Sequence, residues 1–248
     1  MTIIHNQPFI NISMFFKKAF LAVFGFLFFL AGLQAQRASN NYNYLDFNQK
    51  PYYFGITLGY NSSDFKVFRS KNFIANDEIR ITEGVTGPGF NLGVVSNLRV
   101  GEYFDIRFLP TLSFAERNIE YKKIKEINPD PQKFEQVLVE LPFHVRYKSA
   151  PYNDKRMFLI AGCKYVYDVA STSKVRQSAT LVKIAPTDFC FEIGTGIQMY
   201  FPYFIFSPEI KFSRGLSNVL LYNNNVVKSQ VLEKVLSRGL TVSLHFEG

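Results

Sequence analysis

The residues best suited to acid–base chemistry are two histidines, His144 and His245, because His5 lies ahead of a predicted leader segment. A Ser-His-Asp catalytic group needs its members within hydrogen-bond reach of one another at one site. The two histidines fall on predicted strands that are not neighbours, and no serine and acid converge on either of them. Two isolated histidines also make no metal site. We therefore expect no enzyme, no cofactor and no metal, and a histidine whose bonds are satisfied inside the fold.

Two other motifs point to structure rather than chemistry. Gly194-Thr195-Gly196 resembles part of a phosphate-binding loop, but the strand-turn-helix context of that motif is missing. Small residues facing into a crowded interior explain it better. Cys163 and Cys190 fall on opposite faces of adjacent predicted strands, which argues against a disulfide.

Composition excludes several classes of protein. An apolar content of 47% excludes a disordered or fibrous chain, and 19% charged residues is low for a soluble enzyme of 248 residues. Two cysteines cannot form a disulfide framework or a four-ligand zinc site. The net charge of +8 fits a nucleic-acid surface and an anionic membrane surface equally well.

The elements that must position these residues are strands, because apolar and polar residues alternate with period two. Eight segments show the alternation: residues 54–60, 89–94, 104–113, 137–147, 159–168, 188–198, 204–212 and 239–246. The predicted connections at 100–103, 148–156 and 200–203 are short, whereas those at 61–85, 116–136, 170–185 and 215–237 are long. Short periplasmic turns alternating with long outer loops are typical of a membrane barrel. Aromatic residues crowd the strand ends, at 52–54 and 200–203, where interface girdles are expected.

The predicted fold class is therefore all-β: an eight-stranded antiparallel up-and-down transmembrane barrel. The alternative is a soluble barrel such as a lipocalin, whose strands alternate in the same way but point their apolar face inward. The 27 Phe residues and the mixture of Gly, Ser, Thr and single charges on the polar face favour the membrane barrel.

Up-and-down strands place charged residues in the lumen of such a barrel. Buried charges must be paired, and residues of opposite sign lie on neighbouring predicted strands. We expect a structural ion-pair network made of nine residues: Asp105, Arg107, Glu140, His144, Arg146, Lys164, Glu192, Glu209 and Lys211. An eight-stranded barrel has room only for side chains, so the lumen should be plugged.

The N-terminal part reads as a secretory signal. Lys17 and Lys18 precede an apolar run from Ala19 to Leu30, and small residues follow up to Ala35. The run is shorter than a spanning helix requires. We predict a signal peptide over 1–35 with Met14 as a candidate initiator, a periplasmic segment over 36–51, and a barrel over 52–248.

The long predicted loops remain as candidate binding segments. Apolar residues of the loop 219–236 recur at helical spacing: Val226, Val227, Val231, Leu232, Val235 and Leu236. They predict either a short helix over the barrel mouth or a docking surface for a partner protein.

Three segments resemble the PorT family of outer-membrane barrels: residues 139–148 (VELPFHVRYK), 161–168 (AGCKYVYD) and 207–216 (SPEIKFSRGL). The resemblance extends from Tyr52 to Phe246 and rests on the order and spacing of weak, strand-like motifs. It implies an integral outer-membrane component of the type IX secretion apparatus, in some relatives also supporting gliding motility. It brings no catalytic residues.

The expected function is thus a non-enzymatic secretion component that acts through protein contacts. Its expected partners are outer-membrane lipid and other type IX secretion subunits, with no nucleic acid and no small-molecule substrate. The alternative function is a general outer-membrane barrel for adhesion, ligand binding or envelope integrity.

Overall fold

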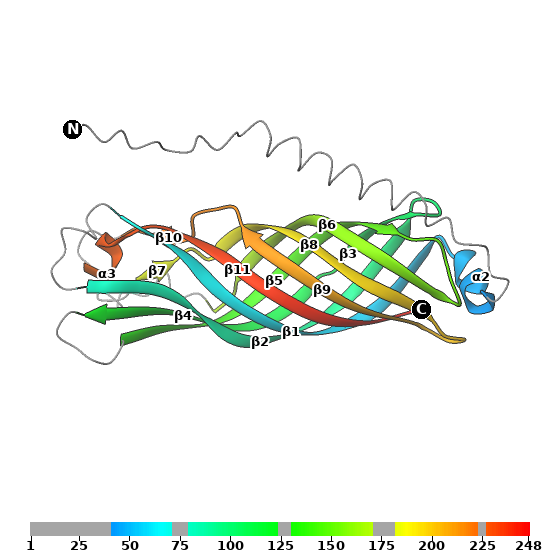
Figure 1. The fold of residues 1–248 in the computed structure, drawn as a ribbon, viewed down its shortest axis with the longest axis horizontal. Helices are drawn as coiled ribbons and strands as arrows, with labels where there is room; N and C mark the ends of the chain where they lie inside the picture. The colour runs from blue at the N-terminus through cyan, green and yellow to red at the C-terminus, as the bar shows by residue number, and fades with distance from the viewer. Residues whose placement is uncertain (1–40, 71–78, 124–129, 171–181, 223–226) are drawn as a thin grey trace, which may run out of the picture. The chain divides into compact units, whose positions relative to one another are not determined.

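The strands of the chain close into one antiparallel barrel (Figure 1). The structure is a computed structural model, and it describes residues 41–70, 79–123, 130–170, 182–222 and 227–248. The predicted signal peptide, including Lys17, Lys18 and Met14, lies outside the described residues. None of the helices among the described residues is long and apolar enough to cross a membrane.

The barrel wall has eight strand positions that follow the chain order. They are β1 (Tyr52–Arg69), β2 (Ile79–Arg99), β3 (Phe104–Phe108) with β4 (Thr111–Lys123), β5 (Asp130–Lys148), β6 (Lys155–Asp168), β8 (Thr187–Tyr200), β9 (Ile205–Gly215) and β11 (Leu232–Glu247). Each position pairs with its neighbours in the chain, and β1 closes the ring by pairing with both β2 and β11. The prediction of an eight-stranded up-and-down barrel is confirmed.

β3 and β4 share one position because a proline interrupts the ladder of hydrogen bonds between them. Pro110 has no N–H to donate, and its carbonyl instead accepts from the N–H of Val94 at 3.0 Å. The register against β2 continues unchanged across the break, from Ser96↔Phe108 to Gly93↔Thr111.

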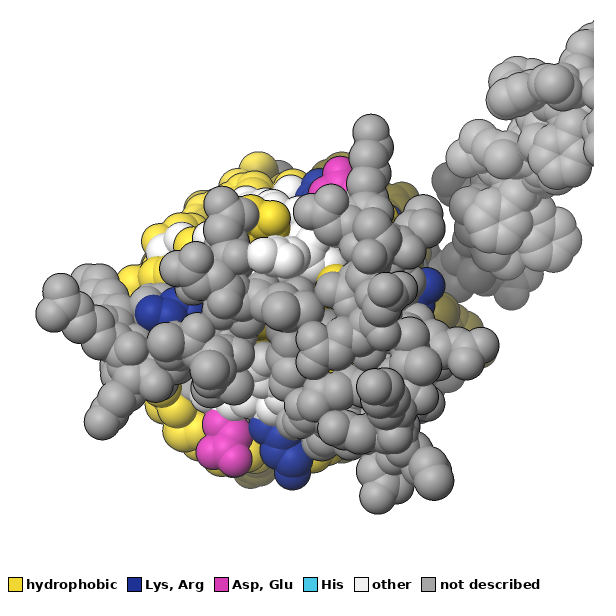
Figure 2. Space-filling view, turned by 90° about the vertical axis from the view of Figure 1, so that its left-hand side faces the viewer, with side chains coloured by type: hydrophobic (Ala, Val, Ile, Leu, Met, Phe, Trp, Pro, Cys, Tyr) yellow, Lys and Arg dark blue, Asp and Glu magenta, His cyan; other side chains and the backbone are white. Residues whose placement is uncertain are grey.

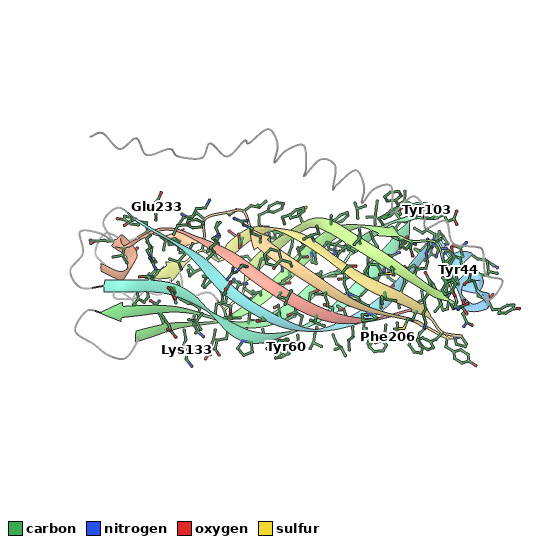
Figure 3. The ribbon with its side chains drawn as sticks, in the orientation of Figure 1. Tyr44, Tyr60, Tyr103, Lys133, Phe206 and Glu233 are labelled. Carbon is green, nitrogen blue, oxygen red and sulfur yellow. The ribbon has the colours of Figure 1, made fainter. Side chains whose placement is uncertain are left out.

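The apolar face of the wall points outward. Along β1 the side chains of Tyr52, Phe54, Ile56, Leu58 and Tyr60 are all exposed. Figure 2, which looks onto the barrel from the side of α3, shows hydrophobic side chains around its outer circumference. In Figure 3, Tyr60 and Phe206 project outward from the wall. We call this exposed apolar surface the belt. In a soluble barrel the apolar side chains would point inward instead.

One end of the barrel, the turn end, carries the three short connections near 100–103, 149–154 and 201–204. The tightest is a two-residue turn in which Asn153 and Asp154 both have positive φ, 48° and 55°. Tyr152 and Lys155 exchange two backbone hydrogen bonds around it, at 2.9 and 3.0 Å. Asn and Asp tolerate this left-handed conformation, which matches the twist of a hairpin. The short connections were thus correctly predicted.

The other end, the loop end, differs from its prediction in how far the strands run. β1 continues to Arg69 and β2 starts at Ile79, so most of the predicted loop 61–85 is strand. Likewise β4 and β5 extend through much of 116–136. Beyond the belt β1 keeps pairing with β11, β2 with β4, and β4 with β5. Polar outward residues replace apolar ones there, so the alternation signal is lost.

An apolar cluster fills the inside of the loop end. A small sheet of β7 (Lys183–Ile184) and β10 (Leu220–Leu221) lies there with the short helix α3 (Val227–Gln230). Ten buried residues form the loop-end cluster: Phe65, Ile119, Tyr121, Val182, Ile184, Val219, Leu220, Val231, Leu232 and Val235.

The helix predicted from the apolar spacing of 219–236 is mostly wrong. Only Val227–Gln230 is helical, and β11 already begins at Leu232. Val231, Leu232 and Val235 are fully buried in the loop-end cluster, so these three side chains are not a docking surface. Val226 lies outside the described residues. Burial against β1 and β10, rather than helical periodicity, determines the structure of this segment.

Candidate functional site: a closed interior and a capped turn end

All nine residues predicted for the lumen point into the barrel. Period-two alternation puts Glu140, His144 and Arg146 on the inner face of β5, and the same rule applies to the other strands. Each of the nine is less than 9% exposed. The same interior holds four titratable residues that the predicted network does not include: Lys148, Arg156, His245 and Glu247.

Near the turn end the network is centred on Asp105. The Asp105 carboxylate lies 2.5 Å from Nζ of Lys148 and 3.1 Å from Nη2 of Arg146. Arg146 also lies 3.8 Å from Glu247, which in turn lies 2.5 Å from Nη2 of Arg107. All of these side chains are completely buried.

The second part of the network crosses the lumen. Arg107 of β3 reaches Glu209 of β9 at 3.1 Å, although these strands are not neighbours in the ring. Glu209 also lies 3.4 Å from Nζ of Lys211 and 3.4 Å from Nε2 of His245. Side chains that span the ring in this way occupy its cross-section.

The third part lies further toward the loop end. Nε2 of His144 on β5 is 2.6 Å from Glu192 on β8. Lys164 of β6, between those strands, lies 3.1 Å from Glu192 and 3.1 Å from Glu140. Each histidine therefore contacts a carboxylate within an ion-pair cluster, with no serine nucleophile among the contacts described for either.

Charge is balanced across the network. Arg107, Arg146, Lys148, Lys164 and Lys211 are five cations, and Asp105, Glu140, Glu192, Glu209 and Glu247 are five carboxylates. A buried charge is tolerated when it is paired and hydrogen-bonded. Removing one member of the network would therefore leave an opposite charge buried without its partner and would destabilise the barrel.

The missed members carry the same alternation signal as the predicted ones. Lys148 stands two residues after Arg146, and Glu247 two residues after His245. Both lie at the last positions of their strands, which alternation locates least well. Every second residue of a strand shares one face, so Lys148 and Glu247 are expected to point inward once each strand is extended to its observed last residue.

A small polar cavity lies inside the described part of the barrel. It has a volume of about 20 Å³ and lies between the network and the loop-end cluster, lined by polar groups that include Asn61, Ser113 and Lys164. That volume is close to what a single water molecule requires.

The turn end is capped by the helix α2 (Tyr42–Asn48), which the sequence did not predict. Asp154 of the two-residue turn accepts the backbone N–H of Tyr44 at 2.9 Å and the amide of Asn43 at 3.2 Å. At the other end of α2, Arg99 donates to the carbonyls of Phe47, at 3.2 Å, and Asn48. A carboxylate at the N-terminus and a cation at the C-terminus both suit the helix dipole.

Aromatic packing fixes α2 against the strand ends. Tyr44, Phe47, Tyr53, Tyr200 and Ile205 form a buried cluster. The predicted aromatic girdle is therefore wrong for Tyr53 and Tyr200, whose rings point into the barrel, because inward and outward positions alternate within each aromatic run.

Tyr44 links the helix to the polar interior. Its hydroxyl donates to Asn48 at 3.1 Å and accepts from Arg156 at 3.2 Å. Burial raises the pKa of the Tyr44 phenol, and the nearby Arg156 guanidinium opposes that rise only in part. Tyr44 therefore stays protonated and can donate to Asn48. Figure 3 places it with Tyr103 at the turn end.

Comparison with known proteins decides the class of this barrel. A family model described as "Outer membrane protein beta-barrel domain" matches residues 34–221. The chain belongs to this outer-membrane family. It is therefore an integral outer-membrane barrel, and its turn end faces the periplasm while its loop end faces outward. No curated protein matches the sequence.

The chain is also similar to three solved outer-membrane proteins at low identity. OprG of Pseudomonas aeruginosa is 10% identical over 79% of this chain and 93% of its own, with a TM-score of 0.48. Ail of Yersinia pestis, solved with the heparin analogue sucrose octasulfate, is 11% identical over 80% and 100%, with a TM-score of 0.36. Neisserial surface protein A is 12% identical over 77% and 95%, with a TM-score of 0.34.

The network predicts a large cost for removing a single carboxylate. Glu209→Gln should lower the free energy of unfolding by about 3–5 kcal/mol, because Arg107 and Lys211 would be left buried with too little negative charge. Urea titration of the barrel refolded into lipid vesicles measures this. Glu135→Gln, at an exposed position of β5, is the matched control and should change stability by less than about 0.5 kcal/mol. Equal effects of the two substitutions would contradict the role given to Glu209.

Proposed function

We propose that this protein is a non-enzymatic outer-membrane anchor that works by binding other molecules at its ends, with no transport through its lumen. The observation that carries the proposal is the ion-pair network, in which Arg107 reaches across the ring to Glu209 and Glu247. Two further features support the proposal: α2 caps the turn end, and the loop-end cluster fills the loop end. Neither histidine belongs to a catalytic arrangement among the contacts described.

More specifically, we propose a role in type IX protein secretion. The sequence resemblance of 139–148, 161–168 and 207–216 to the PorT family supports this role. So does the outer face of α2, where Tyr42 and Leu45 are exposed at 72% and 57% on an element held to the barrel by Asp154 and Arg99. A rigid apolar surface in the periplasm suits contact with another secretion subunit.

The second candidate is binding of an extracellular ligand. The strands of β1, β2, β4 and β5 extend beyond the belt, and the loop-end cluster packs inside them. This arrangement makes the loop end a rigid scaffold, and loops held on a rigid scaffold often contain the residues that bind a ligand. Lys133 and Glu233 lie at this end (Figure 3).

The proposal predicts that ions do not pass through the lumen. In planar lipid bilayers the purified barrel should show no ion conductance above that of protein-free lipid, because buried side chains fill its cross-section. A porin reconstituted in the same lipid is the positive control. Reproducible single-channel steps from this barrel would contradict the proposal.

A deletion strain separates the two candidate functions. Under the secretion proposal, loss of the gene retains type IX cargo inside the cell, and the wild-type gene restores export. Leu45→Glu, on the exposed face of α2, should fail to restore it because a charge replaces an apolar contact. Leu221→Glu, at a position of the loop end that is 39% exposed, should restore it fully.

The reverse pattern would favour the extracellular role. Export that is normal without the gene, together with surface binding that is lost in Leu221→Glu and kept in Leu45→Glu, would contradict the secretion role. Heat-modified gel mobility, which reports a folded barrel, verifies that both variants insert.

A further inference from the structure

Two arginines face each other on the outer wall of the barrel. Arg214 of β9 and Arg238 of β11 are direct partners across neighbouring strands. Both are exposed on the outward face. Residues directly opposite in an antiparallel pair have Cβ atoms only about 5 Å apart, and like charges placed there destabilise the sheet.

These arginines stand toward the outer end of the apolar belt, where Leu216 and Phe189 are still exposed beyond Arg214. The next outward pair toward the periplasm is Phe212↔Leu240, with exposed apolar side chains on both strands. On the other side of β9, Arg214 is opposite Phe191 of β8, which is also exposed. One step along the strand pair is about 7 Å, so the guanidinium groups stand closer to the outer headgroup layer than the Phe212↔Leu240 pair does.

The described part of the chain places one counterion against these two charges. Asp64 of β1 accepts two hydrogen bonds from Arg238, from Nε at 2.9 Å and from Nη2 at 2.5 Å. Among the described residues no acid pairs with Arg214. A second anion near Arg214 would offset both its own charge and its repulsion from Arg238.

A cleft in the wall adds a further cation beside this pair. The regular pairing of β1 with β2 ends at Ser63↔Gly87, although Gly84 still approaches the backbone of Phe65 closely beyond that point. The cleft beside these strands has a volume of about 470 Å³, and its lining includes Lys66, Phe68 and Arg238. The Arg69–Glu83 pair also lines it, and there the carboxylate has its own cation at 3.9 Å. Polar and apolar lining side by side suits a molecule that has a charged head and a hydrocarbon part.

We propose that Arg214 and Arg238, with Lys66 beside them, bind the phosphate group of an outer-leaflet lipid. Arginine presents a planar fork of donors that matches a phosphate, and Arg214 has donors to spare. The adjoining apolar side chains Phe191 and Phe212 contact the acyl chains of the same lipid. The site lies on the outside of the wall, so it is independent of the function of the two ends.

The test is a titration of the full barrel in neutral detergent micelles with diphosphorylated lipid A, and with phosphatidylcholine as the uncharged comparison. The wild type should bind lipid A at least about tenfold more tightly than phosphatidylcholine. Arg214→Gln should weaken lipid A binding about fivefold, as expected for one interfacial cation. Lys133→Gln, a matched loss of one cation on β5, should leave binding unchanged.

A charge reversal distinguishes binding from folding. Arg214→Glu puts a carboxylate opposite Arg238, so it should abolish the preference for lipid A while leaving the unfolding midpoint as high as that of the wild type. Equal binding by Arg214→Gln and Lys133→Gln would overturn the site. Displacement of lipid A by inorganic phosphate at equal concentration would also overturn the proposal, since it would assign the arginines to a free anion.

Discussion

The structure depends on the pairing of ionised side chains in a buried interior. The ion-pair network inside the ring joins five cations to five carboxylates, and residues such as Arg107 bridge strands that are not neighbours. An unpaired charge there would cost several kcal/mol. The same alternation that turns these groups inward turns Phe, Tyr, Ile and Leu outward, so the belt and the network are two consequences of one register. A shift of one residue in any strand would expose charges to lipid and bury aromatic rings among ions.

Each end of the barrel is completed by residues far away in the chain. At the periplasmic end, Asp154 and Arg99 hold α2 by its two termini, over 110 and about 50 residues of sequence. At the outer end, Phe65, Tyr121 and Val231 come together from three separate hairpins and loops. The protein is thus closed at three levels, and its exposed features lie on the outside of the wall and at its two ends. This is why we propose that the protein acts through its surfaces rather than through its lumen.

The sequence predicts the wall well and its ends poorly. Alternation locates residues such as Glu140, Lys164 and Glu192 on inner faces, because in a strand the direction of a side chain depends only on parity. Alternation does not say whether the inner face is polar or apolar. The high Phe content favoured an apolar outer face, as in a membrane barrel, and the family match supports this choice. Tyr53 and Tyr200 were misassigned because an aromatic run contains both parities. The cap α2 and the strand at Leu232 depend on contacts between distant segments, which local patterns do not record.

The most direct test of the account is which face of the wall touches lipid. The chain has no Trp, so one introduced tryptophan reports on a single position. Phe143 is 54% exposed on the outer face of β5, whereas Phe158 is 2% exposed on the inner face of β6. In vesicles of lipid with brominated acyl chains, the fluorescence of Phe143→Trp should be strongly quenched and that of Phe158→Trp nearly unaffected. Strong quenching of Phe158→Trp with none of Phe143→Trp would contradict the inside-out barrel.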